Sequence, residues 1–148
     1  MAVQRMDHVG VIVDDLAAAI AFFAEVGLEL DGEMSAEGPA VERIVGLEDV
    51  RTDFAFMRTP DRKGALELIK FKSPAYDGDN DPSAPSHAPG IRHIAFAVDD
   101  IEATLARLQA LGAERVGELV QYEQSYRLCY VRGPEGIVVG LAEELNAP

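Results

Sequence analysis

Two histidines and one glutamate are the residues of this chain whose types and spacing suit metal chemistry. His8 and His93 lie near the starts of two apolar segments with similar sequences, and Glu67 lies within the apolar segment 65–69. A carboxylate in an apolar strand is costly unless it has a partner. Two imidazoles and one carboxylate form a ligand set for a divalent metal that leaves coordination positions open. The sequence therefore predicts a metal site of His8, Glu67 and His93, provided that the fold brings these side chains together.

The two histidines occupy the same position of an internal repeat. Residues 6–16 align without a gap with residues 91–101, at an offset of 85 residues that places His8 on His93. Further matched pairs are Val13 and Val98, Asp14-Asp15 and Asp99-Asp100, and Gly27 and Gly112. Self-similarity at a fixed period is typical of repeated structural units. We therefore interpret the chain as a duplicated unit.

Each repeat is expected to form a β-α-β-β-β module. Its first strand, at 8–13 or 93–98, is rich in β-branched and apolar residues. The Asp-Asp pair that follows is suited to capping a helix, and helical periodicity then leads to a glycine at the helix end. The further strands are expected at 28–34, 50–59 and 65–72 in the first module and at 113–121, 126–132 and 137–142 in the second, with a short helix within 39–47.

These elements predict one domain, residues 1–148, made of two repeats. The first module spans 1–72 and the second spans 91–148. The intervening residues 73–90 are rich in Pro, Gly, Asp and Ser, which indicates a linker. A lid over the site is its second predicted role.

Strand alternation predicts where the three candidate ligands point. Side chains alternate between the two faces of a strand. If Val9, Val11 and Val13 face the helix, His8 faces the other way, and the same alternation applies to His93. Leu66 and Leu68 would likewise leave Glu67 on the face away from the helix. Small residues beside the histidines would leave room on that face for a ligand.

Composition excludes several other classes of protein. About 48% of the 148 residues are hydrophobic, enough for a sizeable core. The net charge of −13 disfavours nucleic acid and anionic lipid as partners. Cys129 is the only cysteine, which excludes an intramolecular disulfide and a cysteine-built zinc site. We expect a soluble, cytoplasmic protein without a signal peptide or membrane span, because the apolar stretches are too short.

The chain resembles the vicinal oxygen chelate superfamily, which includes glyoxalase I, bleomycin-resistance proteins, fosfomycin-resistance enzymes and extradiol dioxygenases. The motifs that carry the resemblance are Asp7-His8-Val9-Gly10-Val11, Leu66-Glu67-Leu68, residues 91–101 and Gly133-Pro134-Glu135-Gly136-Ile137. The resemblance implies an α+β fold, with two βαβββ modules forming a cupped eight-stranded mixed sheet around a divalent metal ion. It implies His8, Glu67, His93 and one residue of 137–141 as ligands, and a homodimer as the assembly.

The fourth position departs from the family pattern. Families of the glyoxalase and epimerase type have a Glu where this chain has Gly140. Glu143 is predicted to lie on the opposite strand face, and Glu144 lies roughly 13 Å further along the strand. A site with three protein ligands and an extra open position resembles those of Fe(II) dioxygenases and catalytic zinc. Without a metal, the cup would be a binding pocket like that of the antibiotic-sequestering relatives.

The function expected is that of a metal-dependent enzyme acting on a small organic substrate that chelates the metal through vicinal oxygens. The reaction would be of the lyase or isomerase type or a ring cleavage, with Zn, Mn, Fe, Ni or Co as the ion. Non-catalytic binding of a small molecule, as in bleomycin-resistance proteins, is the alternative. Among Tyr122, Tyr126 and Tyr130, we expect Tyr126 to line the pocket. Either Tyr126 or a metal-bound hydroxide would then serve as the base in place of the missing carboxylate.

Overall fold

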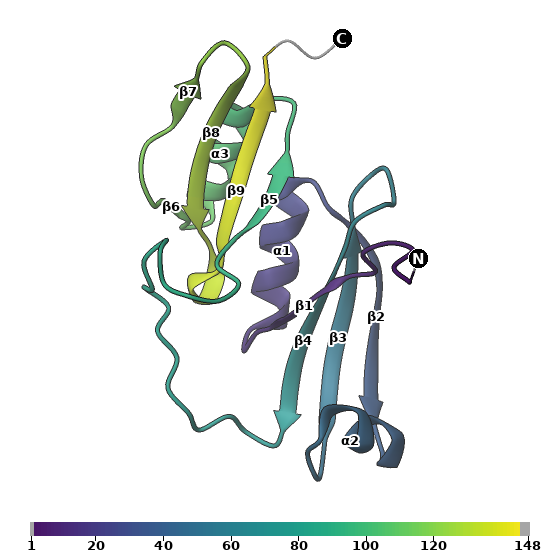
Figure 1. Cartoon of the computed structure of the whole chain (residues 1–148). Coiled ribbons are helices and arrows are strands. Elements are labelled where there is room, and N and C mark those ends of the chain that lie inside the picture. The colour runs from purple at the N-terminus through teal and green to yellow at the C-terminus, as the bar shows by residue number, and fades with distance from the viewer. Residues whose placement is uncertain (1, 146–148) are drawn as a thin grey trace. The chain divides into compact units, whose positions relative to one another are not determined.

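The structure, a computed structural model that describes residues 2–145, contains two compact units that divide between Asp79 and Asn80. Each unit has its own mixed β-sheet and its own packed helix (Figure 1). The predicted α+β class is confirmed, and each half begins with the predicted strand, helix and strand, although one expected strand of the second half is divided into two. The first unit contains β1 (Val9–Ile12), α1 (Leu16–Val26), β2 (Glu29–Glu37), α2 (Pro39–Val45), β3 (Arg51–Arg58) and β4 (Ala65–Ser73). The second contains β5 (Ile94–Ala97), α3 (Ile101–Ala110), β6 (Glu114–Arg115), β7 (Val120–Tyr122), β8 (Tyr126–Arg132), a 3₁₀ turn (Pro134–Gly136) and β9 (Val138–Glu144).

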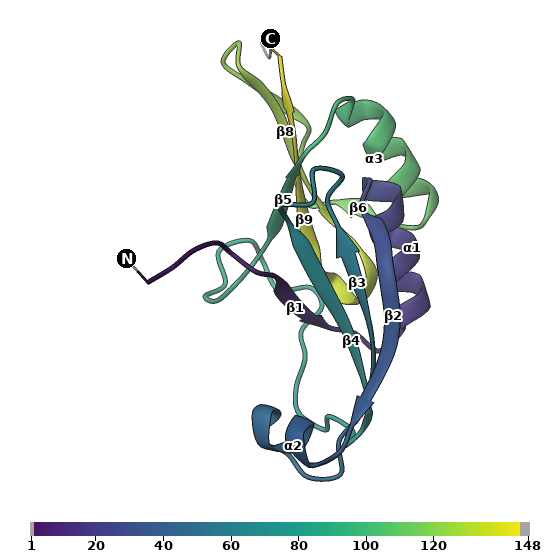
Figure 2. The same ribbon diagram turned by 90° about the vertical axis from the view of Figure 1, so that its right-hand side faces the viewer.

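The four-stranded sheet of the first unit has the order β1-β4-β3-β2, with β1 parallel to β4. Helix α1 lies along one face of this sheet (Figure 2). It begins where the Asp15 carboxylate accepts a hydrogen bond from the Ala18 N–H at 3.0 Å, and it ends at Gly27, whose φ of 123° favours glycine. Phe22 and Phe23 are almost fully buried on this helix. The sheet residues Ala55, Met57, Leu66 and Leu68 are buried as well, and together these side chains form the core of the unit.

The sheet of the second unit has the order β5-β9-β8-β6, with β7 paired to β8. The Asp100 carboxylate caps α3 by accepting from the Ala103 N–H at 3.0 Å, and the Glu143 carboxylate accepts from the Ile101 N–H at 2.8 Å. The predicted single strand 113–121 is two short strands, β6 and β7. A glycine, Gly117, lies in the irregular stretch between them, and glycine weakens a strand interior.

The Pro-rich segment before β5 is bound to the second unit by two arginines. The Arg132 guanidinium donates to the carbonyl oxygens of Pro82 and Ala84, each at 3.0 Å. Arg92 donates to the carbonyls of Ala88 and Pro89. Charge-assisted hydrogen bonds of this kind are stronger than neutral ones. The part of the linker that belongs to this unit is therefore held against it at four carbonyls.

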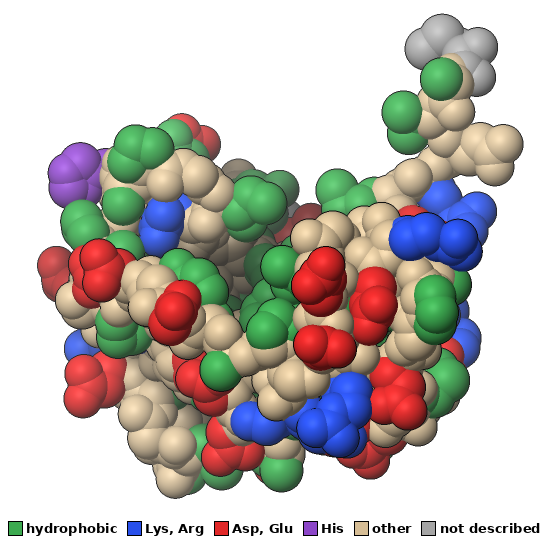
Figure 3. Space-filling view, turned by 90° about the horizontal axis from the view of Figure 1, so that it is seen from below, with side chains coloured by type: hydrophobic (Ala, Val, Ile, Leu, Met, Phe, Trp, Pro, Cys, Tyr) green, Lys and Arg blue, Asp and Glu red, His purple; other side chains and the backbone are tan. Residues whose placement is uncertain are grey.

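The surface is acidic, as the charge of the sequence predicts. Figure 3 shows one face of the molecule, on which Asp and Glu side chains are widely spread while Lys and Arg gather in few places. Within residues 2–145, no helix is long and apolar enough to cross a membrane.

Candidate functional site

The structure confirms the predicted strand faces of the three candidate ligands. His8, which immediately precedes β1, is exposed, whereas Val13, which follows β1, is only 1% exposed. Glu67 lies between Leu66 and Leu68, which are buried against α1. His93 is also exposed at the start of β5. We call the sheet face opposite the helix the open face of each unit; it carries His8 and Glu67 in the first unit and His93 in the second.

His8 and Glu67 lie close together on the open face of the first unit. The parallel pairing of β1 with β4 sets Gly10 beside Glu67. As a result, His8 Nε2 lies 3.8 Å from Glu67 Oε2. The Phe56 ring packs edge-on against the imidazole, with 5.6 Å between ring centroids. The two polar groups are partly exposed, with 36% of the His8 side chain and 22% of the Glu67 side chain accessible to solvent.

Asp7 contacts the imidazole of His8 at Nδ1, the ring nitrogen that does not face Glu67. Its Oδ2 lies 2.7 Å from His8 Nδ1, and its Oδ1 accepts a hydrogen bond from Arg5 at 3.0 Å. The hydrogen bonds from His8 and Arg5 lower the pKa of Asp7, so it is ionised and accepts the Nδ1 proton. In the neutral imidazole the lone pair is then on Nε2, the atom that faces Glu67. Metal-binding histidines commonly donate their other N–H to a carboxylate in this way, so these residues fit a divalent metal.

His93 has a different partner in the second unit. Its Nε2 lies 3.3 Å from the Tyr130 hydroxyl, and the two rings stack with 4.6 Å between centroids and 34° between planes. Gly140 pairs with both Ala95 and Tyr130 in the sheet. A Cβ at position 140 would lie 3.1 Å from Ala95 Cβ and 3.3 Å from Tyr130 Cε1. The position where the family resemblance places a carboxylate thus has no side chain, and the Tyr130 ring adjoins it.

The assembly of the three ligands into one site stays a prediction. His8 and Glu67 belong to the first unit and His93 to the second. Within residues 2–145, no group of three or more His, Cys, Asp or Glu side chains is arranged to hold a metal ion. Each half of the predicted ligand set is nevertheless on the open face of its own sheet, which is where alternation places it.

Two tyrosines of β8 differ in their relation to His93. Tyr126, the predicted base, opens the strand, pairs with Glu144 and is 39% exposed. Tyr130 is the residue that contacts the imidazole. Sequence reasoning named Tyr130 as one of three tyrosines but did not single it out, because its contact with His93 depends on the order β5-β9-β8.

Several residues outside the predicted site could also be considered for a functional role. Asp31 accepts hydrogen bonds from Arg58 at 2.7 Å and from Arg62 at 3.1 Å, so the charge of Arg58 is matched within the unit. Cys129 is 4% exposed and burial raises the pKa of its thiol, so it is a core residue. His87 is exposed in the Pro-rich segment.

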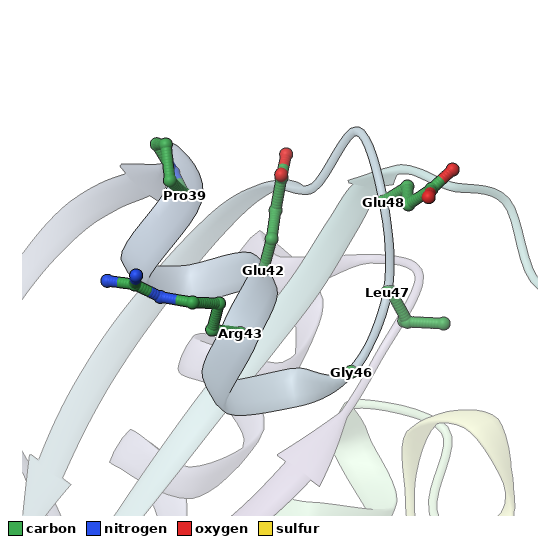
Figure 4. A pocket seen from close by; sticks show the side chains of 6 residues that line it. All are labelled: Pro39, Glu42, Arg43, Gly46, Leu47 and Glu48. Atoms are coloured by element: carbon green, nitrogen blue, oxygen red, sulfur yellow. The ribbon is translucent and has the colours of Figure 1, made fainter.

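A shallow pocket of about 300 Å³ lies at α2 (Figure 4). It is lined by Pro39, Glu42, Arg43, Gly46, Leu47 and Glu48. Arg43 and Leu47 extend away from each other, and the Glu42 carboxylate accepts a hydrogen bond from the Val50 N–H at 3.3 Å. None of the candidate ligands lines this pocket, and its polar groups do not converge as they do in a typical binding site.

Comparison with known proteins finds one family by sequence and by structure. The family model described as Glyoxalase/Bleomycin resistance protein/Dioxygenase superfamily matches residues 5–141. The crystal structure of a glyoxalase family protein from Bacillus cereus is 46% identical to the chain, with a TM-score of 0.94 and coverage of 99% of both chains.

Two more distant structures are similar in fold. A mutant of the fosfomycin resistance protein FosX from Listeria monocytogenes, solved with Mn(II) and 1S,2S-dihydroxypropylphosphonic acid, is 16% identical, with a TM-score of 0.61 and coverage of 98% of this chain and 92% of that one. TnmS3, an antibiotic binding protein from Streptomyces sp. CB03234, is 22% identical, with a TM-score of 0.62 and coverage of 97% and 98%.

Proposed function

The chain belongs to the glyoxalase/bleomycin resistance protein/dioxygenase superfamily, and on this premise we propose that it is a metal-dependent enzyme for a small organic substrate with vicinal oxygens. The reaction would be of the lyase or isomerase type or a ring cleavage. His8, Glu67 and His93 would be the protein ligands of a divalent ion. Because the superfamily supports several chemistries on one fold, the proposal depends on the residues of the open faces.

The arrangement of Asp7, His8 and Glu67 is the observation that carries this proposal. The carboxylate of Asp7 fixes the proton of His8 on Nδ1, and Nε2 faces a second carboxylate at 3.8 Å. A purely structural histidine does not need an oriented lone pair beside a partly buried glutamate. The Mn(II) and the dihydroxy compound in the FosX structure support the same class of chemistry.

The side chains of this chain would bind the ion and surround it. His8 and Glu67 supply a nitrogen and an oxygen ligand, which suits Zn, Mn, Fe, Ni or Co. A bound ion of this kind acts as a Lewis acid on substrate oxygens. The Phe56 ring, which packs edge-on against the imidazole, would cover one side of the His8 ligand. Since Gly140 supplies no carboxylate, we propose that Tyr126 provides the proton-transfer group.

Sequestration of a small molecule is the second candidate function. The open face of the second unit favours it, because Gly140, Ala95 and Ala97 are small while Val120, Tyr122, Tyr126 and Leu128 expose more than a third of their surface. Aromatic side chains on an apolar face suit a planar, uncharged ligand. TnmS3 has the same fold and is an antibiotic binding protein.

Metal titration of the purified protein separates the two functions. We expect calorimetry to show that the metal-free protein binds one Mn²⁺ or Zn²⁺ ion for each set of His8, Glu67 and His93. The substitutions His8→Ala, Glu67→Gln and His93→Ala should each abolish this binding. His87→Ala is the matched control, because His87 is an exposed histidine outside the proposed site. A wild type that binds neither ion, but binds a planar aromatic antibiotic, would establish sequestration instead.

We also propose that the protein is a cytoplasmic homodimer whose partner is a small molecule. The dimer rests on the resemblance to superfamily members. Light scattering of the eluting protein tests it, and a mass of 16.0 kDa in solution would refute it.

A further inference from the structure

The two histidines of the repeat are held by different chemical partners. In the first unit, the carboxylate of Asp7 accepts from His8 Nδ1. The residue at the equivalent position of the second unit is Arg92, which donates to the carbonyls of Ala88 and Pro89 and cannot accept a proton from His93. The orientation of His93 must therefore come from another group.

Tyr130 is the group that contacts His93. Its hydroxyl lies 3.3 Å from Nε2, and its ring stacks on the imidazole at 4.6 Å. A phenol is a good hydrogen-bond donor, and a neutral imidazole has one nitrogen that accepts. If the Tyr130 O–H donates to Nε2, the ring proton of His93 is on Nδ1. This is the tautomer that Asp7 imposes on His8.

Because residue 140 has no side chain, the Tyr130 ring can lie directly beside it. Gly140 lies between Ala95 and Tyr130 in the sheet order β5-β9-β8. A Cβ there would be 3.3 Å from Cε1 and 3.4 Å from Cδ1 of the Tyr130 ring. A side chain at this position would require the Tyr130 ring or the Ala95 side chain to shift by a few tenths of an ångström. The position of the Tyr130 ring thus depends on the glycine at position 140.

We propose that Tyr130 is a positioning residue that holds His93 in the Nδ1-protonated tautomer, and that position 140 is glycine because the Tyr130 ring occupies the adjoining space. The use of this tautomer for metal or substrate binding rests on the proposed function. The tautomer itself is a property of the protein without a ligand. Both histidines then carry their proton on Nδ1, His8 because an acceptor faces its Nδ1 and His93 because a donor faces its Nε2.

Nitrogen-15 NMR of the imidazole rings tests the inference in the metal-free protein at about pH 8, where an ordinary histidine is neutral. We expect His93 of the wild type to carry its proton on Nδ1. In Tyr130→Phe, which keeps the ring and removes the hydroxyl, the ratio of the Nδ1 to the Nε2 tautomer should fall about two- to tenfold, the equilibrium weight of one hydrogen bond. Gly140→Ala should lower the ratio in the same direction by displacing the ring.

Two controls accompany these variants. His8 should keep its tautomer in every variant, because Asp7 holds it independently. Tyr122→Phe removes a hydroxyl from β7 of the same unit and should leave the His93 ratio unchanged. A wild-type His93 protonated on Nε2, or a ratio unaltered by Tyr130→Phe, would overturn the role of Tyr130. An unaltered ratio in Gly140→Ala would overturn the explanation of the glycine.

The tautomer experiment and the metal titration can fail independently of each other. A protein that shows the expected tautomers but binds neither Mn²⁺ nor Zn²⁺ refutes the enzyme proposal and leaves the role of Tyr130 standing. A protein that binds metal while Tyr130→Phe leaves both the tautomer and the metal affinity unchanged refutes the role of Tyr130 alone.

Discussion

The first and second units share a scaffold and differ on their open faces. In both, a strand leads from a histidine to an aspartate that caps the following helix at 3.0 Å. The first unit surrounds its histidine with the carboxylates of Asp7 and Glu67, whereas the second places a tyrosine and a glycine beside His93. In each repeat, the residue types of the helix caps and of the core are constrained by hydrogen bonding and by packing. The open face is free of that packing and can differ between the units, and it carries the three candidate ligands.

The two helices bury side chains of different size at one matched position, and truncating these side chains should have the largest effect on stability. Phe23 on α1 corresponds to Leu108 on α3 at the repeat offset, and both are 0% exposed. Phe23→Ala should lower the free energy of unfolding by about 3–5 kcal/mol and Leu108→Ala by about 2–5 kcal/mol, measured by urea denaturation. Leu111→Ala, at a residue that is 51% exposed, should cost less than about 1 kcal/mol. Equal losses for Leu108 and Leu111 would contradict the packing of α3.

The carboxylate of the first unit should dominate metal affinity. Glu67→Gln removes the charged ligand and should weaken Mn²⁺ or Zn²⁺ binding at least about 100-fold, the upper end of what losing an outer-shell partner costs. Calorimetric titration measures the change. Glu144→Gln in the second unit is the matched control, because Glu144 lies at the exposed end of β9. Similar losses in the two variants would show that the acidic surface, and not a defined site, attracts the ion.

The partner of His8 should matter more than the corresponding residue of the second unit. Asp7→Asn keeps the shape of the side chain and removes the charge that fixes the Nδ1 proton, so metal affinity should fall about 10- to 100-fold. Arg92→Gln should change the affinity less than about twofold, since Arg92 donates to backbone carbonyls and has no contact with His93 that orients the ring. A larger effect of Arg92 in the same titration would show that the Pro-rich segment influences the ligands.

The helix caps should show the smallest effects and the closest agreement between units. Asp15→Ala and Asp100→Ala each remove one hydrogen bond to the first turn of a helix, at Ala18 and Ala103. Each should cost about 1 kcal/mol in thermal or urea unfolding. A cost several times larger in one unit would indicate that its aspartate has a role beyond capping.

The scaffold was predictable because its signals are local. Strand alternation alone placed His8, Glu67 and His93 on the open faces, and the Asp-Asp pairs located the helix starts. Gly27 has the positive φ of 123° that its position at the helix end predicts. These features depend on the neighbours of each residue in the chain.

The partners on the open faces depend on pairing between distant strands. The contact of Tyr130 with His93 requires β9 to lie between β5 and β8, which no local pattern specifies. The proximity of His8 and Glu67 likewise follows from the parallel pairing of β1 with β4. The division of 113–121 into two short strands was also missed, because propensity does not show where a ladder is interrupted.

The arginine contacts of the Pro-rich segment have a consequence for its cleavage. Exposed connections between structured elements are usually the first places that a protease cuts. Here four carbonyls between Pro82 and Pro89 are bound by Arg132 and Arg92. A protease must bind its substrate as an extended chain, so this stretch should resist nicking while the exposed Tyr76, on the N-terminal side of it, offers the easier site.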